Sequence, residues 1–205
     1  KYALPHIQIV SIGLTKIKVQ LHKDIAIISN QDVPLEIAMK KALERLCHEA
    51  DWPVGHIYFT SVDTLDNLVP SFLWYLKDPK QFEVFRRVTE VTPLAQGVGL
   101  PGRVLESGKP AWIKDVTQDE NFPRASHAMD IGVRAGFAFP ILIGSHVAGV
   151  MEFFSTRAVE PDRDLLQIME HIGTLLGRVM ERKKAEMALW NQQKEQAIIF
   201  NSVPA

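Results

Sequence analysis

The sequence predicts an α+β fold in which an antiparallel β-sheet is flanked by helices, with long helices towards both ends of the chain. The first observation is a pair of short β-branched and aromatic runs, residues 54–61 and 69–76, joined by turn-forming residues. The second is a pair of apolar runs, 133–143 and 147–155, and the third is a set of apolar seams at helical spacing on either side. Because strands and helices do not alternate, we exclude a doubly wound parallel sheet and expect a mainly antiparallel sheet with helices on one side.

The expected N-terminal helix carries a heptad pattern. Its apolar positions fall at alternating steps of three and four residues, interrupted only by Asp24: Ile7, Val10, Leu14, Ile17, Leu21 and Ile28. Residues 16–21 also alternate between apolar and polar, so a strand is the competing interpretation of that segment. The longer register favours an N-terminal helix within residues 1–31.

A second helix is expected to begin near Asp32, whose carboxylate is a suitable N-cap, and to end before Pro53. Pro34 is tolerated in the first turn of a helix. One apolar stripe runs along this segment: Leu35, Ala38, Met39, Ala42, Leu43, Leu46 and Ala50.

Shorter elements are expected between the two pairs of strands. A segment starting at Asp78 can form one short helix, and GRVLESG can form another that Gly108 ends in the C′ position. A short apolar run, AWI, is followed by an irregular loop from Asp115 to about Ile131. The last two strands are joined by a tight turn at residues 144–146.

The C-terminal helix is expected to start near Pro161 and to carry a continuous inward seam: Leu165, Ile168, Met169, Ile172, Leu175, Leu176, Val179 and Met180. Beyond Met180 only Met187, Leu189 and Trp190 continue the seam. A single copy would leave the seams of both terminal helices partly exposed. We therefore expect a parallel homodimer through the helices near 7–28 and 161–190.

Composition sets limits on the class of protein. The 205 residues are 46% hydrophobic and 23% charged, which is typical of a globular domain with attached segments. The 24 acidic and 23 basic residues give a formal charge of -1, so we expect no nucleic-acid partner. No apolar run reaches the ~20 residues needed to span a bilayer, so we expect no membrane insertion and a cytoplasmic location. Because the chain begins at Lys1 and stops at Ala205, we expect it to be a piece of a longer protein.

The stretch GVGLPG, residues 97–102, matches the G-x-G-x-x-G pattern of dinucleotide-binding turns. The preceding VTPLAQ is not a continuous buried strand, and Gly108 stops the following helix after about two turns. Pro101 removes one amide that would face a phosphate, and Glu120 is a single acidic residue in a polar loop. We reject the dinucleotide interpretation and expect the glycines to serve a tight turn into the helix.

Several motifs occur in order with consistent spacing: GVGLPGRVLESGKPAWIKD from Gly97 to Asp115, NFPRA from Asn121, GFAFPI from Gly136 and GVMEFFS from Gly149. Together they resemble a GAF domain of bacterial sensory proteins, over about residues 32–180. The resemblance implies an antiparallel sheet with flanking helices, a small-ligand pocket between the sheet and its covering loops, and a regulatory role without chemistry.

The C-terminal segment QAIIFNSVPA resembles the entry into a PAS domain. The resulting organisation is an N-terminal signalling helix at 1–31, a GAF domain at 32–180, a helical linker at 181–196 and the start of a PAS-like domain at 197–205. The resemblance implies further partners in the same chain, namely a PAS domain and an output domain such as a histidine kinase or a diguanylate cyclase.

The segment NFPRASHAMDIGVRAG resembles the bilin-holding segment of phytochromes. Aligned on Gly132, the chromophore-bonding cysteine is replaced by Pro123 and the following histidine by Arg124. Thioether attachment needs a thiol beside the pocket, whereas Cys47 lies on the first helix of the domain beside its apolar stripe, as a small hydrophobe does. The sequence argues against a covalent bilin.

Cyclic-nucleotide-binding relatives carry an Asn-Lys, Phe and Asp-Glu signature. Here Asp119 and Glu120 precede Asn121 and Phe122 instead of following them, so cyclic nucleotide is not supported.

Haem would require a neutral imidazole from His56, His127 or His146. His56 falls on a strand, where it can simply be hydrogen-bonded, and His146 falls in a turn. Structural roles account for the histidines better, so haem is not supported and the cofactor stays unknown.

Catalysis is not expected in this chain. One GAF family reduces free methionine sulfoxide through several cysteines, and Cys47 alone cannot complete that relay. The sequence offers no nucleophile elbow, no paired-carboxylate site and no His-x-x-x-His pair.

The expected pocket combines aromatic residues of the strands with polar residues of the covering loop. Strand aromatics also serve as core, and Asp115 can cap the loop backbone, whereas Ser126 and His127 lie where specificity usually resides. The predicted ligand-binding residues are Tyr58, Trp74, Trp112, Asp115, Phe122, Ser126, His127, Phe137 and Phe139.

The sequence thus predicts a regulatory sensor module that binds a small ligand and passes a signal through a dimeric helix. The alternative is a dimerisation and spacing domain that binds no ligand.

Overall fold

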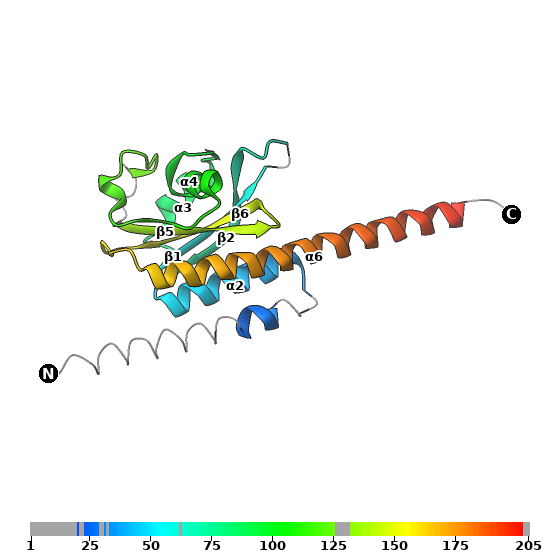
Figure 1. The fold of residues 1–205 in the computed structure, drawn as a ribbon. Coiled ribbons are helices and arrows are strands. Elements are labelled where there is room, and N and C mark those ends of the chain that lie inside the picture. The colour runs from blue at the N-terminus through cyan, green and yellow to red at the C-terminus, as the bar shows by residue number, and fades with distance from the viewer. Residues whose placement is uncertain are drawn as a thin grey trace.

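The structure is a computed structural model that describes residues 20, 23–28, 31, 33–61, 63–125 and 132–202, with side chains of the last helix described to Glu195. Figure 1 shows a sheet with helices above and below it and one long helix that extends past the domain. The elements are α2 (Leu35–Ala50), β1 (Val54–Thr60), β2 (Asn67–Leu76), α3 (Glu83–Glu90), β3 (Leu94–Ala95), α4 (Gly99–Ser107), β4 (Ala111–Ile113), η1 (Val116–Gln118), β5 (Ala135–Ile143), β6 (His146–Ser155) and α6 (Arg163–Ser202).

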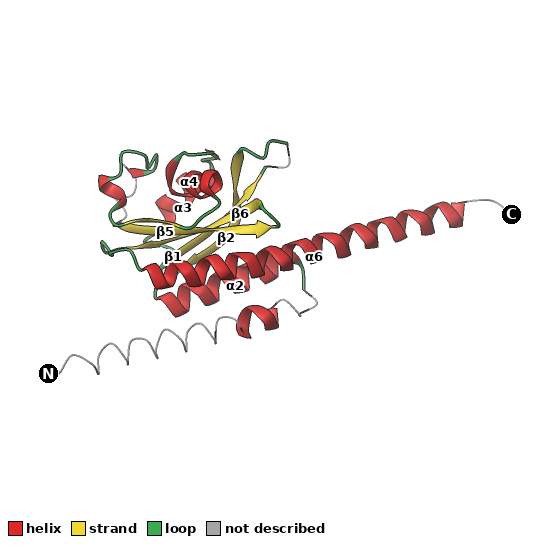
Figure 2. Cartoon of the chain, in the orientation of Figure 1, coloured by secondary structure: helices red, strands yellow, loops and turns green. Residues whose placement is uncertain are grey.

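The six strands form one sheet in the order β3-β2-β1-β6-β5-β4, and every neighbouring pair is antiparallel. The α+β prediction and both predicted hairpins are confirmed. The expectation of helices on one side is wrong, because α2 and α6 cover one face while α3 and α4 cover the other (Figure 2). The two short helices had too few apolar positions for their face to be assigned from sequence.

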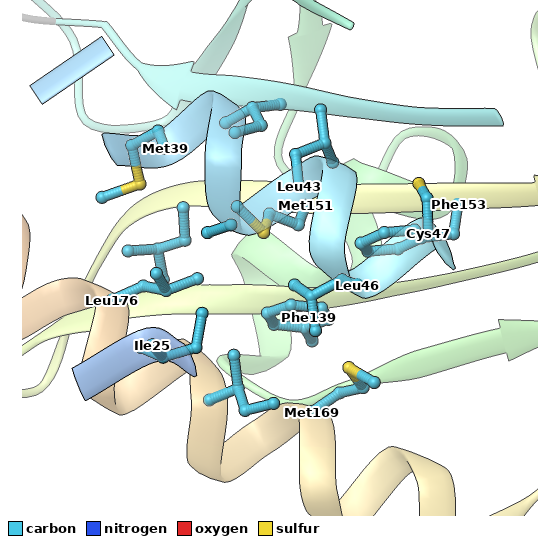
Figure 3. Close-up of a cluster of buried hydrophobic side chains, with 14 of the residues drawn as sticks. Ile25, Met39, Leu43, Leu46, Cys47, Phe139, Met151, Phe153, Met169 and Leu176 are labelled. Carbon is cyan, nitrogen blue, oxygen red and sulfur yellow. The ribbon is translucent and has the colours of Figure 1, made fainter. Parts of the chain in front are cut away.

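The first core lies between the sheet and the pair α2 and α6. Figure 3 shows Leu43 and Leu46 of α2, Met169 of α6 and Phe139 of β5 converging on a single apolar layer. The predicted stripe of α2 and the predicted seam of α6 both face this layer, as the 3.6-residue period requires. Residues 23–28 form a helical turn whose Ile25 also packs there.

Two predicted boundaries are corrected. Helix α2 begins at Leu35, after Pro34 at the N-cap with no capping side chain, and Asp32 lies outside the described residues. Strand β6 begins at His146, so the turn before it is tighter than expected and centres on Gly144 and Ser145, with Gly144 at φ 59°.

Cys47 is buried where α2 meets β1. A Cβ at Gly55 would overlap its sulfur, so this strand position has no room for a side chain. Burial raises the pKa of the thiol, in keeping with the packing role predicted for it.

The second core lies between the opposite face of the sheet and the helices α3 and α4. It is built from the alternate residues of the same strands, including Tyr58 of β1 and Val150 and Phe154 of β6, together with Phe85 of α3. The loop from β4 to Ala125 closes over this core with Val116 and Phe122.

The glycines of GVGLPG serve the backbone turn, as predicted. Gly97 and Gly99 have φ of 78° and 65°, a left-handed conformation that favours glycine. A Cβ on Gly102 would overlap the carbonyl oxygen of Ala95. The Gly97 amide donates to the Gly102 carbonyl at 2.8 Å, so the loop folds back on the first turn of α4.

Helix α6 sits directly on the backbone of β5. A Cβ at Gly173 would overlap the carbonyl oxygen of Pro140, and one at Gly177 would overlap that of Leu142. The helix runs on without a break to Ser202, beyond the expected linker, and its described side chains from Lys184 to Glu195 are exposed. The PAS-like start at 197–205 stays a prediction.

None of the helices in the described part of the chain combines the length and the apolarity needed to cross a bilayer.

Candidate ligand site

A cluster of buried charged and polar side chains occupies the second core. Glu152 on β6 lies opposite His56 on β1 in the strand register, and both point to the face covered by α3. Arg124, from the loop after η1, reaches down to Glu152, with Nη1 at 2.9 Å from Oε1 and Nη2 at 2.7 Å from Oε2. Nη1 also donates to Oγ1 of Thr89 on α3 at 3.0 Å. The cluster therefore joins the covering loop, α3 and the centre of the sheet.

The Arg124 guanidinium is enclosed by aromatic rings. Its Cζ lies 5.0 Å from the ring centroids of Phe85 and Phe122 and 5.4 Å from that of Phe154. Only 1% of Arg124 is exposed, and Glu152 is fully buried. Bidentate pairing and aromatic faces are the two interactions that most suit a guanidinium in a dry site.

His56 completes the cluster on its other side. Its Nδ1 lies 3.1 Å from Oε1 of Glu152 and its Nε2 lies 3.0 Å from the carbonyl oxygen of Ser71. Its ring stacks on Trp74 at 4.0 Å between centroids. Because both ring nitrogens already face protein oxygens, binding iron at His56 would break one of these contacts.

Two buried donors in this region find no acceptor among the described residues, namely Nε1 of Trp74 and Nε of Arg124. Native proteins pair nearly all buried polar groups, so each such donor calls for an explanation. Both belong to side chains of the second core.

Electrostatics keep the central pair charged. Burial by itself raises the pKa of Glu152, but the Arg124 charge and the hydrogen bonds from His56 and Arg124 outweigh burial and hold it below its usual range. Burial lowers the pKa of Arg124, but the Glu152 charge raises it further, to above its usual range. Burial likewise raises the pKa of Tyr58, whose hydroxyl donates to the Thr92 carbonyl at 3.2 Å.

Polar contacts fasten the covering loop to α4. Arg103 pairs with Asp119 through two hydrogen bonds of 2.8 and 2.6 Å. The Asn121 side chain accepts from the Gly99 amide at 3.0 Å and donates to the Gly97 carbonyl at 2.9 Å. The loop that carries Phe122 and Arg124 is thus anchored just before these two residues.

A family model of the GAF domain matches residues 32–181, most of the chain and nearly the whole of the folded part. The chain belongs to the GAF domain family. Members of this family are, in general, regulatory and sensor modules.

Comparisons with individual proteins agree with this assignment. Protein NLP8 of Arabidopsis thaliana is 38% identical over 100 residues, which cover 44% of this chain and 10% of that protein. The chain therefore spans only a small part of this relative. The GAF domain of A. aeolicus nlh2, solved in an inactive state, has a TM-score of 0.64 and 21% identity over 83% of this chain and 99% of that one.

An enzyme with the same fold is also similar. The free methionine-R-sulfoxide reductase of Neisseria meningitidis, solved in complex with its substrate, has a TM-score of 0.65 and 14% identity over 81% of this chain and 89% of that one. At this identity the likeness shows the fold alone.

The GAF fold divides the predicted ligand-binding residues between two faces. Tyr58, Trp74 and Phe122 lie together in the second core, around the Arg124 cluster. Phe137 and Phe139 lie in the first core, under α2 and α6, and the half-buried Trp112 stacks on Phe137 at 5.3 Å. One pocket cannot include both groups, because the sheet separates them. Neighbouring strand residues alternate between the two faces of a sheet, and the sequence pattern did not assign each predicted residue to a face.

The predicted loop residues have separate outcomes. Asp115 caps the η1 turn, since its Oδ1 accepts from the Thr117 amide at 3.0 Å, and it also pairs with Arg134 at 3.0 Å. This is the backbone-capping role that the sequence allowed. Ser126 and His127 lie outside the described residues, so their part in the pocket stays a prediction.

Sequence reasoning missed Arg124, Glu152 and Thr89 as members of the site. A signal was present for Glu152, because it is the one charged residue in the apolar strand GVMEFFS. A glutamate at an inward position of a buried strand needs a partner. No local pattern could identify Arg124 as that partner, because it lies 28 residues away along the chain.

Proposed function

We propose that this GAF domain is a sensor module of a multidomain bacterial signalling protein. A small ligand would bind on the α3 and α4 face of the sheet, and helix α6 would carry the response to an output domain further along the same chain. The observation that carries this proposal is the direct seating of α6 on β5, which joins the sheet to a helix that leaves the domain.

Only two neighbouring strands separate the buried cluster from helix α6. Strand β5 pairs with β6 at Ala138 and Glu152, so the buried cluster and the glycine contacts of α6 share two neighbouring strands. At Gly173 and Gly177 no side chain separates the helix backbone from the backbone of β5. Small shifts of β5 would therefore be passed on to the helix, because close-packed interfaces do not deform continuously.

The exposed part of α6 supports a dimer. Met187, Leu189 and Trp190 are 56%, 56% and 59% exposed, an unusual number of large apolar side chains on one free helical segment. Met187 and Trp190 lie three residues apart on one helix face, so a second copy of the same helix would cover these two side chains as a parallel coiled coil. Dimeric signalling helices are the expected route from sensor to output in the proposed assembly.

Sedimentation equilibrium of the whole chain tests this step. The wild type should be a dimer, and Met187→Glu/Trp190→Glu should shift it to monomer, because two charges would be placed in the interface. Gln192→Glu/Gln193→Glu adds the same charge to the same exposed segment and should stay more dimeric. Equal association of both double variants would remove α6 from the interface.

One observation favours the alternative function, a spacer that binds no ligand. The centre of the second core is filled by Arg124, which has the largest fully buried side chain among the described residues. Native mass spectrometry of freshly purified protein separates the two functions, because a retained small molecule supports the sensor and a bare mass under gentle conditions supports the spacer.

A further inference from the structure

Apart from Phe122, the groups around the Arg124 guanidinium come from elements other than its own loop. Glu152 and Phe154 belong to β6, while Phe85 and Thr89 belong to α3. Strand β6 lies in the middle of the sheet, paired on both sides. Without the arginine, the same carboxylate, hydroxyl and rings would remain in place on regular secondary structure.

These walls have the chemistry of a site for an organic cation. A buried carboxylate offers two acceptor oxygens for a pair of N–H donors, and Thr89 offers a third acceptor. Two aromatic rings on regular secondary structure, Phe85 and Phe154, lie 5.0 and 5.4 Å from the positive charge. Among the described residues no group of His, Cys, Asp and Glu could hold a metal ion, so the surroundings of Glu152 match an organic cation better than a metal.

Arg124 is an imperfect occupant of this site. Its Nε–H is buried without an acceptor among the described residues, which is a penalty carried only while the arginine is inside. Glu152 cannot be left alone, because an unpaired carboxylate in the core is far more unfavourable than a paired one. The site therefore requires a cation but does not require this one.

We propose that this site binds a small organic cation with a guanidinium or primary ammonium group, and that Arg124 is the internal occupant which this ligand displaces. The proposal rests on the sensor function above and names the class of its ligand. Displacement would release Phe122 and Arg124 from the sheet while Glu152 keeps a cationic partner. The covering loop thus has two states, one for each occupant.

Competition sets the expected affinities. A ligand that must displace a tethered residue binds with an apparent affinity reduced by the fraction of protein in which the site is free. Shortening Arg124 should remove the competitor and strengthen binding. Removing the Glu152 carboxylate should abolish binding whichever residue stands at position 124.

The experiment uses methylguanidinium chloride as the probe and methylurea as its neutral isostere, each at millimolar concentrations that do not denature the protein. Thermal unfolding and calorimetric titration are measured for the wild type, Arg124→Ala and Arg124→Ala/Glu152→Gln. If Arg124→Ala does not fold, Arg124→Gln takes its place, because it fills more of the core than alanine and still removes the competing cation. In the wild type, the ¹⁵Nε–H resonance of Arg124 reports whether the arginine leaves its site.

Methylguanidinium should raise the melting temperature of Arg124→Ala saturably and bind it at least ~10-fold more tightly than the wild type. Methylurea should have no such effect, and the double variant should not respond to either compound. At higher concentrations methylguanidinium should shift the Arg124 resonance of the wild type towards that of an exposed arginine.

Two results would overturn the proposal. One is a folded Arg124→Ala or Arg124→Gln protein that methylguanidinium stabilises no more than methylurea does. The other is a wild-type Arg124 resonance that does not move at concentrations that saturate the variant many times over. Either result would make Arg124 a permanent core residue. The sensor function would not be contradicted by either result, because the dimerisation and helix-insertion experiments test it independently.

Discussion

At the scale of single residues, the buried Arg124–Glu152 pair adds little net stability but is costly to break. Burying two charges removes their hydration, and the attraction between them only partly compensates. The pair is nonetheless costly to break, because the remaining charge stays in the core. This asymmetry yields predictions that an apolar core position would not give.

Glu152→Gln should destabilise the folded protein by about 3–5 kcal/mol, because it leaves Arg124 buried without a counter-charge. Denaturant unfolding measures the change. Arg124→Met/Glu152→Leu, which removes both charges, should be less destabilised than Glu152→Gln alone. The matched control is Glu160→Gln, which removes the exposed partner of Lys114 and should change stability by less than about 1 kcal/mol. An Arg124→Met/Glu152→Leu protein that is less stable than Glu152→Gln would contradict this account.

The same pair predicts how stability depends on pH. The folded-state pKa of Glu152 lies below its ordinary value, so its contribution is complete above that ordinary value of about 4.3 and is lost as pH falls through the folded pKa. The difference in unfolding free energy between wild type and Glu152→Gln should therefore be constant from pH 7 to about 5 and shrink in stronger acid. Urea titrations at several pH values measure it. If this difference in unfolding free energy instead grew as the pH fell, the folded-state pKa of Glu152 would lie above its ordinary value and the account would be contradicted.

At the scale of secondary-structure elements, the close contact of α6 with β5 depends on two glycines. Gly173 and Gly177 lie four residues apart, so both face the strand, and no larger residue fits above the Pro140 and Leu142 carbonyls. Glycine is otherwise unfavourable in a helix interior by about 1 kcal/mol relative to alanine. Its use at both positions indicates that closeness to the strand outweighs helix propensity.

Gly177→Ala should destabilise the protein by about 1–3 kcal/mol despite the better helix propensity of alanine, because the helix must move off the strand. Gln192→Ala, in the exposed part of α6, introduces the same residue and should change stability by less than about 0.5 kcal/mol. Thermal unfolding of both variants makes the comparison. A stabilised Gly177→Ala protein would mean that α6 is not held against the backbone of β5.

The elements themselves could largely be predicted from the sequence. The seams of α2 and α6 and the apolar and aromatic runs of β1, β5 and β6 are local patterns, so the position and type of these elements were confirmed. The face on which α3 and α4 lie could not be predicted, because a helix of eight or nine residues with a short apolar stripe fits either side of a sheet. The same ambiguity placed Phe137 and Phe139 in one predicted pocket with Tyr58 and Trp74, although the two pairs lie on opposite faces of the sheet.

The candidate site was less predictable than the fold. Tyr58, Trp74 and Phe122 were predicted as aromatic positions and do surround the cluster. The charged centre brings together residues from β1, α3, the loop after η1 and β6, and only the folded chain juxtaposes them. Pairing across such sequence distances leaves no periodic signal.

At the scale of the whole molecule, the two faces of the sheet carry different features. One face carries a buried cation site and its covering loop, and the other carries a helix that continues away from the domain (Figure 1). The exposed segment of α6 has a thin apolar seam of Met187 and Trp190 among charged residues. A seam of this kind can be shifted between arrangements by modest differences in ligand affinity.

The most direct test of signalling through α6 is an insertion between Lys184 and Met187 in the full-length protein, with output measured with and without stimulus. Each added residue rotates the downstream helix by about 100°, whereas seven residues restore nearly the same face. A one-residue insertion should therefore lock or scramble the output, and a seven-residue insertion should largely preserve regulation. Equal activity and equal regulation in the two insertion variants would show that α6 is a passive tether and would contradict the account.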